Sequence, residues 1–294
     1  MVTPMECDSS IDYIGLLNLF RFNLVYNTTH FLINATTSES LSLSILEKIF
    51  IIRFLRFYFA DTITLYCGSC FCSTSDSLAF LSILNTEYID FVLQITPYYF
   101  ISSSKGIVWH FTVLSLLSVH PIILYNVPKR TALDISSECL ALILQLSNVC
   151  GLKDSSGSYL LNFERVNLCY LANKRFFCGD DTQYLKLRTC GIQGLVSVFS
   201  SCFPYEFRNL QTEVQVCHLY IFKAIVCVCA KVLNPILVKW FLGMFLYYCC
   251  CYRLPLVALG CLQYYAIILD IYFYCKYIFL YRRLECSYYF NEFN

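Results

Sequence analysis

Recurring short apolar runs, each ended by a polar or glycine-containing turn, constrain the fold of this chain more than any other feature of its sequence. There are seven, at residues 30–34, 62–66, 91–95, 121–125, 148–152, 175–178 and 194–198. Most are apolar along nearly their whole length, which is typical of parallel strands buried on both faces. Segments of helical length with apolar spacing lie between most of them, such as residues 42–58, 106–119 and 134–147. The pattern predicts repeated β-strand–α-helix units.

The number of these units favours a closed α/β barrel over an open sheet. Seven units, with a partial first strand at residues 1–5, predict a (β/α)8 (TIM) barrel whose first strand is truncated. From about Pro204 onward the strand and turn signals stop, and helix-compatible stretches continue to the end. We therefore expect a barrel over residues 1–204 and a C-terminal helical region over residues 205–294. No low-complexity linker separates them, so we expect the two to pack together.

The composition narrows the classes of partner. Lys plus Arg (21) nearly balances Asp plus Glu (20), so no net charge attracts nucleic acid or an anionic membrane surface. The chain is 58% hydrophobic, yet its longest segment without these charged residues, 106–128, contains two histidines and two prolines. We expect no membrane span, and keep a membrane protein as a minor alternative because the tail is strongly apolar. No signal peptide is recognisable, so we expect a cytoplasmic protein.

The 19 cysteines do not form a metal-ligand pattern. Cys67 and Cys70 have CxxC spacing and residues 249–251 are consecutive cysteines, but the four histidines are isolated. A structural zinc ion needs four converging ligands, so we predict no metal site. Without an export signal we expect no disulfides either. We interpret much of the cysteine content as drift in composition.

The residues directly after the apolar runs are the candidates for chemistry, because a barrel enzyme has its active site at the carboxyl ends of the strands. Thr36 and Thr37 fit a carboxylate-binding turn at a helix start, but taken alone they fit an ordinary helix cap better. Tyr99 and Tyr125 are candidates for proton transfer, although most of the 24 tyrosines are expected to be packing residues. Arg130 presents a planar fork that matches a carboxylate.

Lys153, which follows the run 148–152, is the candidate for covalent chemistry. A lysine partly desolvated at the mouth of an apolar barrel can supply a neutral amine that attacks a carbonyl and forms a Schiff base. The same position fits a lysine that extends to solvent from a strand end, and this residue alone does not separate the two interpretations. Gly179-Asp180-Asp181 after the next run fits a cap or a polar wall, and we assign it no catalytic role.

Taken in order, these segments resemble the pyruvate-dependent class I aldolases, the family of dihydrodipicolinate synthase and N-acetylneuraminate lyase, and most closely the former. The matching motifs are Val2-Thr3-Pro4, Thr36-Thr37, Thr96-Pro97-Tyr98-Tyr99, Tyr125-Asn126-Val127-Pro128 with Arg130-Thr131, Gly151-Leu152-Lys153, Gly179-Asp180-Asp181, and Asn234-Pro235 with Val238-Lys239-Trp240. They extend to about residue 256, and the tail beyond it stays uninterpreted.

The resemblance implies a Schiff-base-forming lyase of the carbon–oxygen class. Such an enzyme condenses pyruvate with aspartate 4-semialdehyde to 4-hydroxy-tetrahydrodipicolinate, in lysine and diaminopimelate biosynthesis. Lys153 would form the imine with pyruvate, and Tyr125 would donate and accept protons beside it. Thr36 would relay protons between Tyr125 and Tyr99. No metal or organic cofactor is implied.

The resemblance also implies the binding residues and the assembly. Thr37 and the backbone at Val196 would orient pyruvate, and Arg130 would bind the carboxylate of aspartate 4-semialdehyde. Tyr99 would reach across a dimer interface into the neighbouring site, so the implied assembly is a homotetramer made of two tight dimers.

The chain departs from the family pattern at two turns. The family's glycine-rich turn is Ala35-Thr36-Thr37-Ser38 in this chain, and Ala132 replaces the glycine that usually follows Arg-Thr. These replacements would store strain if the glycines have positive φ. In lysine-inhibited members, an interface pocket uses histidine and asparagine where this chain has Ile45 and Cys72, so we expect no lysine feedback.

Two alternatives to the leading function remain at the level of sequence. One is another pyruvate-dependent class I aldolase that acts on sugar acids. The other is a decayed, inactive barrel that serves as an interaction protein. The joint presence of the lysine, the two tyrosines, the threonine and the arginine argues against the second alternative.

Overall fold

The centre of the molecule is a curled parallel sheet. The computed structural model describes residues 1–100, 102–212, 216–229, 233–246, 251–270 and 272. Within them lies a seven-stranded sheet in which each strand pairs with the next along the chain. The strands are β1 (His30–Ile33), β2 (Thr64–Ser69), β3 (Phe91–Ile95), β4 (Ile122–Asn126), β5 (Val149–Asp154), β6 (Arg175–Cys178) and β7 (Gly194–Leu195). Each overlaps one of the seven predicted runs, so the predicted strands are confirmed.

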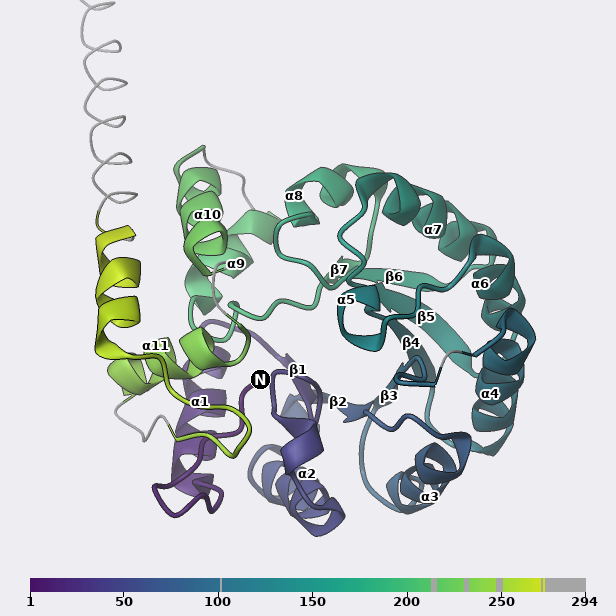
Figure 1. Ribbon diagram of the computed structural model, residues 1–294, viewed down its shortest axis with the longest axis horizontal. Coiled ribbons are helices and arrows are strands. Elements are labelled where there is room, and N and C mark those ends of the chain that lie inside the picture. Colours follow the sequence, from purple (N-terminus) through teal and green to yellow (C-terminus); the bar gives the residue numbers. More distant parts are fainter. Residues whose placement is uncertain (101, 213–215, 230–232, 247–250, 271, 273–294) are drawn as a thin grey trace, which may run out of the picture.

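Helices surround the outside of this sheet (Figure 1). They are α1 (Tyr13–Val25), α2 (Ile45–Phe59), α3 (Thr74–Leu84), α4 (Ser104–Leu117), α6 (Ser137–Leu144), α7 (Tyr159–Leu171) and α8 (Tyr184–Leu187). The short helix α5 (Pro128–Thr131) lies instead over the strand ends, within the ring of helices. Short 3₁₀ turns lie at Ser40–Ser42, Ala60–Thr62 and Arg188–Cys190. The predicted helical segments 42–58, 106–119 and 134–147 correspond to α2, α4 and α6.

Serine caps explain where several of these helices begin. Ser44 precedes α2 and forms a capping box with Glu47, in which each side chain accepts from the other residue's backbone N–H. Ser73, Ser103 and Ser136 accept from backbone N–H groups at the starts of α3, α4 and α6 in the same manner. A serine accepts bonds that the first turn of a helix otherwise leaves unmade, so it fixes the start of the helix.

Alternation along the strands separates a barrel interior from an outer core. Leu93, Ile123 and Tyr125 form one interior cluster, whereas Leu124 and Leu152 pack outward in the core beneath the helices. Successive strand side chains point to opposite faces, so a residue next to an interior one points outward. The carboxyl ends of β4 and β5 therefore present both inward and outward side chains.

The N-terminal segment is hydrogen-bonded to β1 but is not a strand of the sheet. The Met1 amino group donates to the Leu32 carbonyl of β1 at 2.8 Å, and the Ser38 hydroxyl donates to the Met1 carbonyl at 2.8 Å. Pro4 has no N–H to donate, and its carbonyl accepts from Asp12 at 3.0 Å. The expected partial first strand is thus not a strand of the described sheet, which has seven strands rather than eight, and Met5 forms only an isolated bridge with Ile11.

The C-terminal helices lie on the side of the barrel near α1 and α8 (Figure 1). They are α9 (Pro204–Thr212), α10 (Val216–Cys229) and α11 (Ile236–Leu246), and residues 261–270 are also helical. They begin at the predicted position, near residue 204. Phe222 and Leu237 share one core cluster with Leu152 and Phe176 of the barrel strands. The division into regions 1–204 and 205–294 stays a prediction.

Two further expectations concern the membrane and the cysteines. Within the described ranges, no helix is both long enough and apolar enough to span a bilayer. Cys67 and Cys70, the pair with CxxC spacing, are buried free thiols.

Candidate active site

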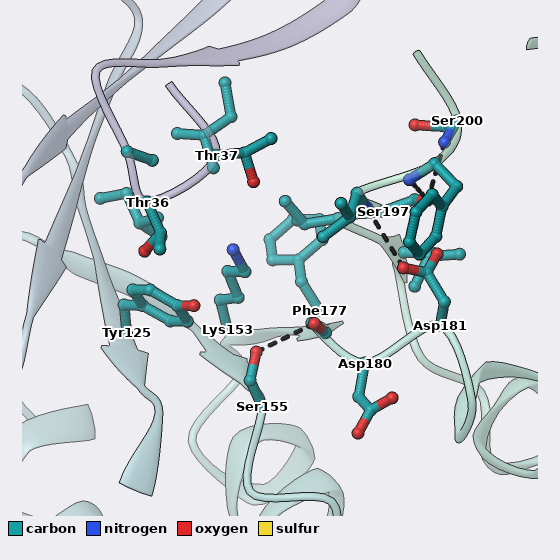
Figure 2. Close-up of a pocket in the computed structure, with 18 of the residues that line it drawn as sticks. Thr36, Thr37, Tyr125, Lys153, Ser155, Phe177, Asp180, Asp181, Ser197 and Ser200 are labelled. Atoms are coloured by element: carbon teal, nitrogen blue, oxygen red, sulfur yellow. Dashed lines mark hydrogen bonds between the residues drawn. The ribbon is translucent and has the colours of Figure 1, made fainter. Parts of the chain in front are cut away.

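A cavity of about 780 Å³ opens at the carboxyl ends of the strands. Loops after β1, β4, β6 and β7 contribute to its lining, together with the ends of β4 and β5. Six of the seven predicted site residues line it, namely Lys153, Tyr125, Thr36, Thr37, Arg130 and Val196. Figure 2 shows Lys153 extending toward the Thr36–Thr37 turn, with Tyr125 on one side and Phe177 on the other.

Lys153 and Tyr125 are neighbours in the sheet and meet inside the barrel. They are register partners on β5 and β4. The Lys153 Nζ atom lies 4.1 Å from the centroid of the Tyr125 ring, a distance at which an ammonium is attracted to the ring face. Lys153 is buried, with an exposure of 7%, and no described carboxylate forms an ion pair with it. The amine is thus confined but not neutralised by a counter-ion.

Gly179 provides the space that the lysine occupies. A Cβ atom built on Gly179 would lie 2.9 Å from Lys153 Cε and 2.1 Å from Ser155 Oγ. Both distances are shorter than real Cβ contacts, so any larger residue here would displace the lysine side chain or Ser155. The Gly179 N–H also donates to the Asp154 carbonyl at 2.7 Å, which holds β6 against the end of β5.

The turn after β1 presents the two threonine hydroxyls. Asn234 Nδ2 donates to Thr37 Oγ1 at 2.8 Å, which leaves the Thr37 hydroxyl proton for another acceptor. Glu39, at the end of this turn, has left-handed backbone with φ 57° and forms a buried ion pair with Lys239 of α11. The C-terminal helical region therefore supports the turn that faces Lys153.

Arg130 lies at the mouth of the cavity, on the short helix α5. Pro128 is the first residue of this helix, and Ala132 ends it with φ 55°, in the left-handed region. Arg130 is exposed and forms no ion pair with a described residue. Of the two alanines that replace glycines, only Ala132 has positive φ, so the expected strain is confirmed there and is absent at Ala35.

Tyr99 does not line the cavity of its own chain. Its side chain is 89% exposed, and its backbone has φ 69°, which is uncommon for a residue with a side chain. Its ring centroid lies 5.8 Å from that of Phe100, which is also exposed. The structure therefore brings together the other predicted residues and leaves Tyr99 on the surface.

Val196 lines the cavity and has one backbone group to offer a ligand. Its N–H donates to the Cys178 carbonyl at 2.8 Å, as a continuation of the β6–β7 pairing. The Val196 carbonyl is consequently the group that can meet a ligand, and it can only accept a hydrogen bond.

Asp181 is a cavity residue to which the sequence analysis gave no role. It is buried, its Oδ2 accepts from the Val198 N–H at 3.2 Å, and its Oδ1 has no hydrogen-bond partner. Burial raises the pKa of this carboxyl from 3.8 to about 6. Asp181 lies across the cavity from Tyr125, beside Ser197 (Figure 2). The sequence signal for Asp181 as a site residue was its position after the run 175–178. The burial of its carboxyl cannot be inferred from that position.

An α/β barrel that holds a lysine amine against a tyrosine at the carboxyl ends of its strands defines a class of enzymes, the Schiff-base-forming barrel lyases. Within that class, residues 1–256 match the model of the dihydrodipicolinate synthetase family. The chain belongs to this family.

Individual relatives agree with this assignment. The 4-hydroxy-tetrahydrodipicolinate synthase of Herminiimonas arsenicoxydans is 32% identical over 213 residues, which are 71% of this chain and 72% of the relative. The chloride-inhibited dihydrodipicolinate synthase from Acinetobacter baumannii, solved in complex with pyruvate, has a TM-score of 0.84 at 24% identity, covering 92% of this chain and 95% of that one. A monomeric dihydrodipicolinate synthase variant has a TM-score of 0.85 at 23% identity, covering 92% and 93%.

Proposed function

We propose that this protein is a 4-hydroxy-tetrahydrodipicolinate synthase, which condenses pyruvate with aspartate 4-semialdehyde in lysine and diaminopimelate biosynthesis. The observation that carries the proposal is the Lys153 amine, 4.1 Å from the Tyr125 ring centroid within a cavity that Thr36, Thr37 and Arg130 also line. The family assignment and the names of the relatives support it.

The first half of the reaction joins pyruvate to the enzyme. The neutral Lys153 amine attacks the keto carbon of pyruvate, and the keto oxygen leaves as water once it is protonated. The protonated imine withdraws electrons, so the methyl group loses a proton and becomes a nucleophilic enamine carbon. Tyr125 is the acid and base beside Lys153, and Thr36 passes protons onward. Thr37 donates its hydroxyl proton to the pyruvate carboxylate.

The second half forms the new carbon–carbon bond. The enamine carbon attacks the aldehyde carbon, whose oxygen takes a proton and becomes a hydroxyl. The amine of the same substrate then attacks the imine carbon, closes the ring and displaces Lys153, which restores the enzyme. Arg130, exposed at the cavity mouth, binds the carboxylate of aspartate 4-semialdehyde through its planar fork.

Tyr99 enters this scheme from a second copy of the chain. Its side chain is 89% exposed, and Phe100 beside it is exposed as well, so the pair offers an aromatic surface. We propose that two chains form a tight dimer in which each Tyr99 serves the partner's cavity. Two such dimers form a homotetramer, located in the cytoplasm.

A turnover assay tests the proposed reaction. Purified protein should consume pyruvate only when aspartate 4-semialdehyde is also present, and Lys153→Ala should abolish this consumption. Pyruvate consumed instead with a sugar-derived aldehyde would transfer the protein to the sugar-acid aldolases. A folded protein that consumes no pyruvate with either aldehyde would favour the inactive barrel.

A further inference from the structure

A buried network of charged and amide side chains lies behind the active-site ends of β4 and β5. It consists of Arg165 on α7, Asp154 at the end of β5, Asn126 at the end of β4, and Asp134 before α6. Arg165 and Asp154 are 3% and 0% exposed, and Asp134 is 38% exposed. None of these residues lines the cavity.

Arg165 binds both carboxylates of this network at once. One terminal nitrogen donates to Asp154 Oδ2 at 2.8 Å, and the other donates to Asp134 Oδ1 at 2.6 Å and to the Ile135 carbonyl at 2.9 Å. Asn126 Nδ2 bridges the same two carboxylate oxygens, at 2.8 Å each. The planar guanidinium has donors for two acceptors in different directions, which a lysine ammonium cannot match in geometry.

The network is connected to the catalytic pair by the alternation of the strands. Tyr125 and Lys153 are register partners that point inward, and the residues that follow them, Asn126 and Asp154, are register partners as well. Asp154 is held further by the Ser156 N–H at 2.8 Å. The outward side chains therefore fix the strand ends whose inward side chains meet at 4.1 Å between Lys153 Nζ and the Tyr125 ring centroid.

The same network closes the base of the loop that carries Arg130. This loop leaves β4 at Asn126 and returns at Asp134, and the hydrogen bond between these two side chains measures 2.8 Å. Arg165 binds the returning end. One buried guanidinium thus restrains both β5, which carries Lys153, and the loop that carries Arg130.

We propose that Arg165 is a positioning residue, which acts through Asp154 to hold Lys153 against Tyr125 and through Asp134 to hold the Arg130 loop. This inference rests on the proposed function, because its readouts are imine formation and turnover. A lysine at this position would keep the charge but could not hold both carboxylates in the geometry of the guanidinium, so the strand ends are expected to shift. A shift of about 1 Å at a reacting group can cost roughly a hundredfold in rate.

The test compares Arg165→Lys with a matched control, Arg56→Lys, in the full chain. Arg56 on α2 is also buried, with 8% side-chain exposure, and pairs with Asp90. It donates to the Tyr88 and Ile63 carbonyls at 2.7 and 2.9 Å, next to the amino ends of β3 and β2, at the opposite end of the strands from the cavity. Both variants keep the positive charge and lose the planar fork that binds a carboxylate and backbone carbonyls at once, so both are expected to unfold at a lower temperature.

Only Arg165→Lys should alter the chemistry. We expect kcat and the rate of borohydride trapping of pyruvate to fall roughly ten- to hundredfold in Arg165→Lys, and to stay within about twofold of the unmodified protein in Arg56→Lys. Equal kcat and trapping rates in the two variants would overturn the positioning role. An unmodified protein that traps no pyruvate would instead overturn the proposed function on which it rests.

A second variant keeps the proposal testable if Arg165→Lys does not fold. Asp134→Ala removes the acceptor at the base of the Arg130 loop and leaves the Arg165–Asp154 bond, and Asp134 is partly exposed. We expect KM for aspartate 4-semialdehyde to rise roughly fivefold or more with pyruvate trapping unchanged. An unchanged KM would contradict the role of Asp134 in holding the Arg130 loop. A loss of pyruvate trapping as large as the rise in KM would contradict it as well.

Discussion

At the residue scale, the site depends on close approach as much as on reactive groups. Lys153 reaches the Tyr125 ring because Gly179 leaves the space that a Cβ atom would fill. The sequence could predict Lys153 and Tyr125 because their motifs follow apolar runs. It could not predict Arg165 or Asp181 as buried groups, because a charged residue in a helix or a loop is ordinarily exposed and only its partners in the fold explain its burial.

Replacing Gly179 with alanine tests the close approach. The added Cβ would lie 2.9 Å from Lys153 Cε, so we expect Gly179→Ala to displace the lysine and to slow imine trapping roughly tenfold or more. Gly260→Ala is a control for chain entropy, because its Cβ atom would meet nothing nearer than 3.8 Å and its φ is not positive. Trapping at the unmodified rate in Gly179→Ala would show that the lysine does not need this space.

The raised pKa of Asp181 predicts how stability depends on pH. Burial raises its pKa from 3.8 to about 6 in the folded state, so the folded state holds a proton that the unfolded chain releases in that range. The associated stability is fully present below pH 3.8 and is lost as the pH rises through about 6, a change of about 3 kcal/mol.

Asp181→Asn should remove this dependence. The free energy of unfolding, measured in urea at pH 5 and at pH 8, should fall less with rising pH in the variant than in the unmodified protein. Asp180→Asn is the comparison at the neighbouring, less buried carboxyl, and its effect should be smaller because the charge of Asp180 is only a minor cause of the raised pKa of Asp181. Identical pH dependence in Asp181→Asn and the unmodified protein would contradict a raised pKa.

At the element scale, the predicted strands are correct in place, and their ends differ for identifiable reasons. The predicted run 62–66 became β2, Thr64–Ser69, which continues through Gly68. Glycine usually weakens a strand, but here the β1 backbone approaches so closely that a Cβ would lie 2.5 Å from the Asn34 carbonyl oxygen. The run 194–198 shortened to β7, Gly194–Leu195, because the Val198 N–H donates to the Asp181 side chain.

The end of α5 stores strain that a single substitution should release. Ala132 ends this helix with φ 55°, a conformation that costs a residue with a Cβ atom about 1–2 kcal/mol. We expect Ala132→Gly to raise the free energy of unfolding by about 1 kcal/mol, measured by denaturant titration. Ala35→Gly, at the turn without positive φ, should lower it instead. The same sign for both substitutions would contradict the strain.

At the scale of the whole molecule, one chain supplies most of the proposed site but not Tyr99. The resemblance predicts Tyr99 as a proton-relay residue, and the described chain leaves its side chain 89% exposed. No sequence pattern within one chain could establish what a second chain covers. The seven motifs and the barrel could be predicted because they depend on local runs and their spacing, whereas the proposed role of Tyr99 would depend on assembly.

Complementation between inactive variants tests the shared site. Tyr99→Phe and Lys153→Ala should each be folded and inactive or nearly so. Mixed by co-expression, they should recover part of the activity, because one cavity in each mixed dimer has an intact lysine and an intact partner tyrosine. Tyr125→Phe mixed with Lys153→Ala is expected to recover none if Tyr125 acts in the same cavity as Lys153 of its own chain. If this second pair recovered as much activity as the first pair, an interface role specific to Tyr99 would be excluded.

The most direct test of the account is where pyruvate becomes attached to the protein. Purified protein is incubated with pyruvate and borohydride, digested, and mapped by mass spectrometry. We expect one modified peptide, with the reduced adduct on Lys153, and no adduct there without pyruvate. Modification of another lysine, or none in a folded protein, would contradict the central claim that Lys153 forms the imine.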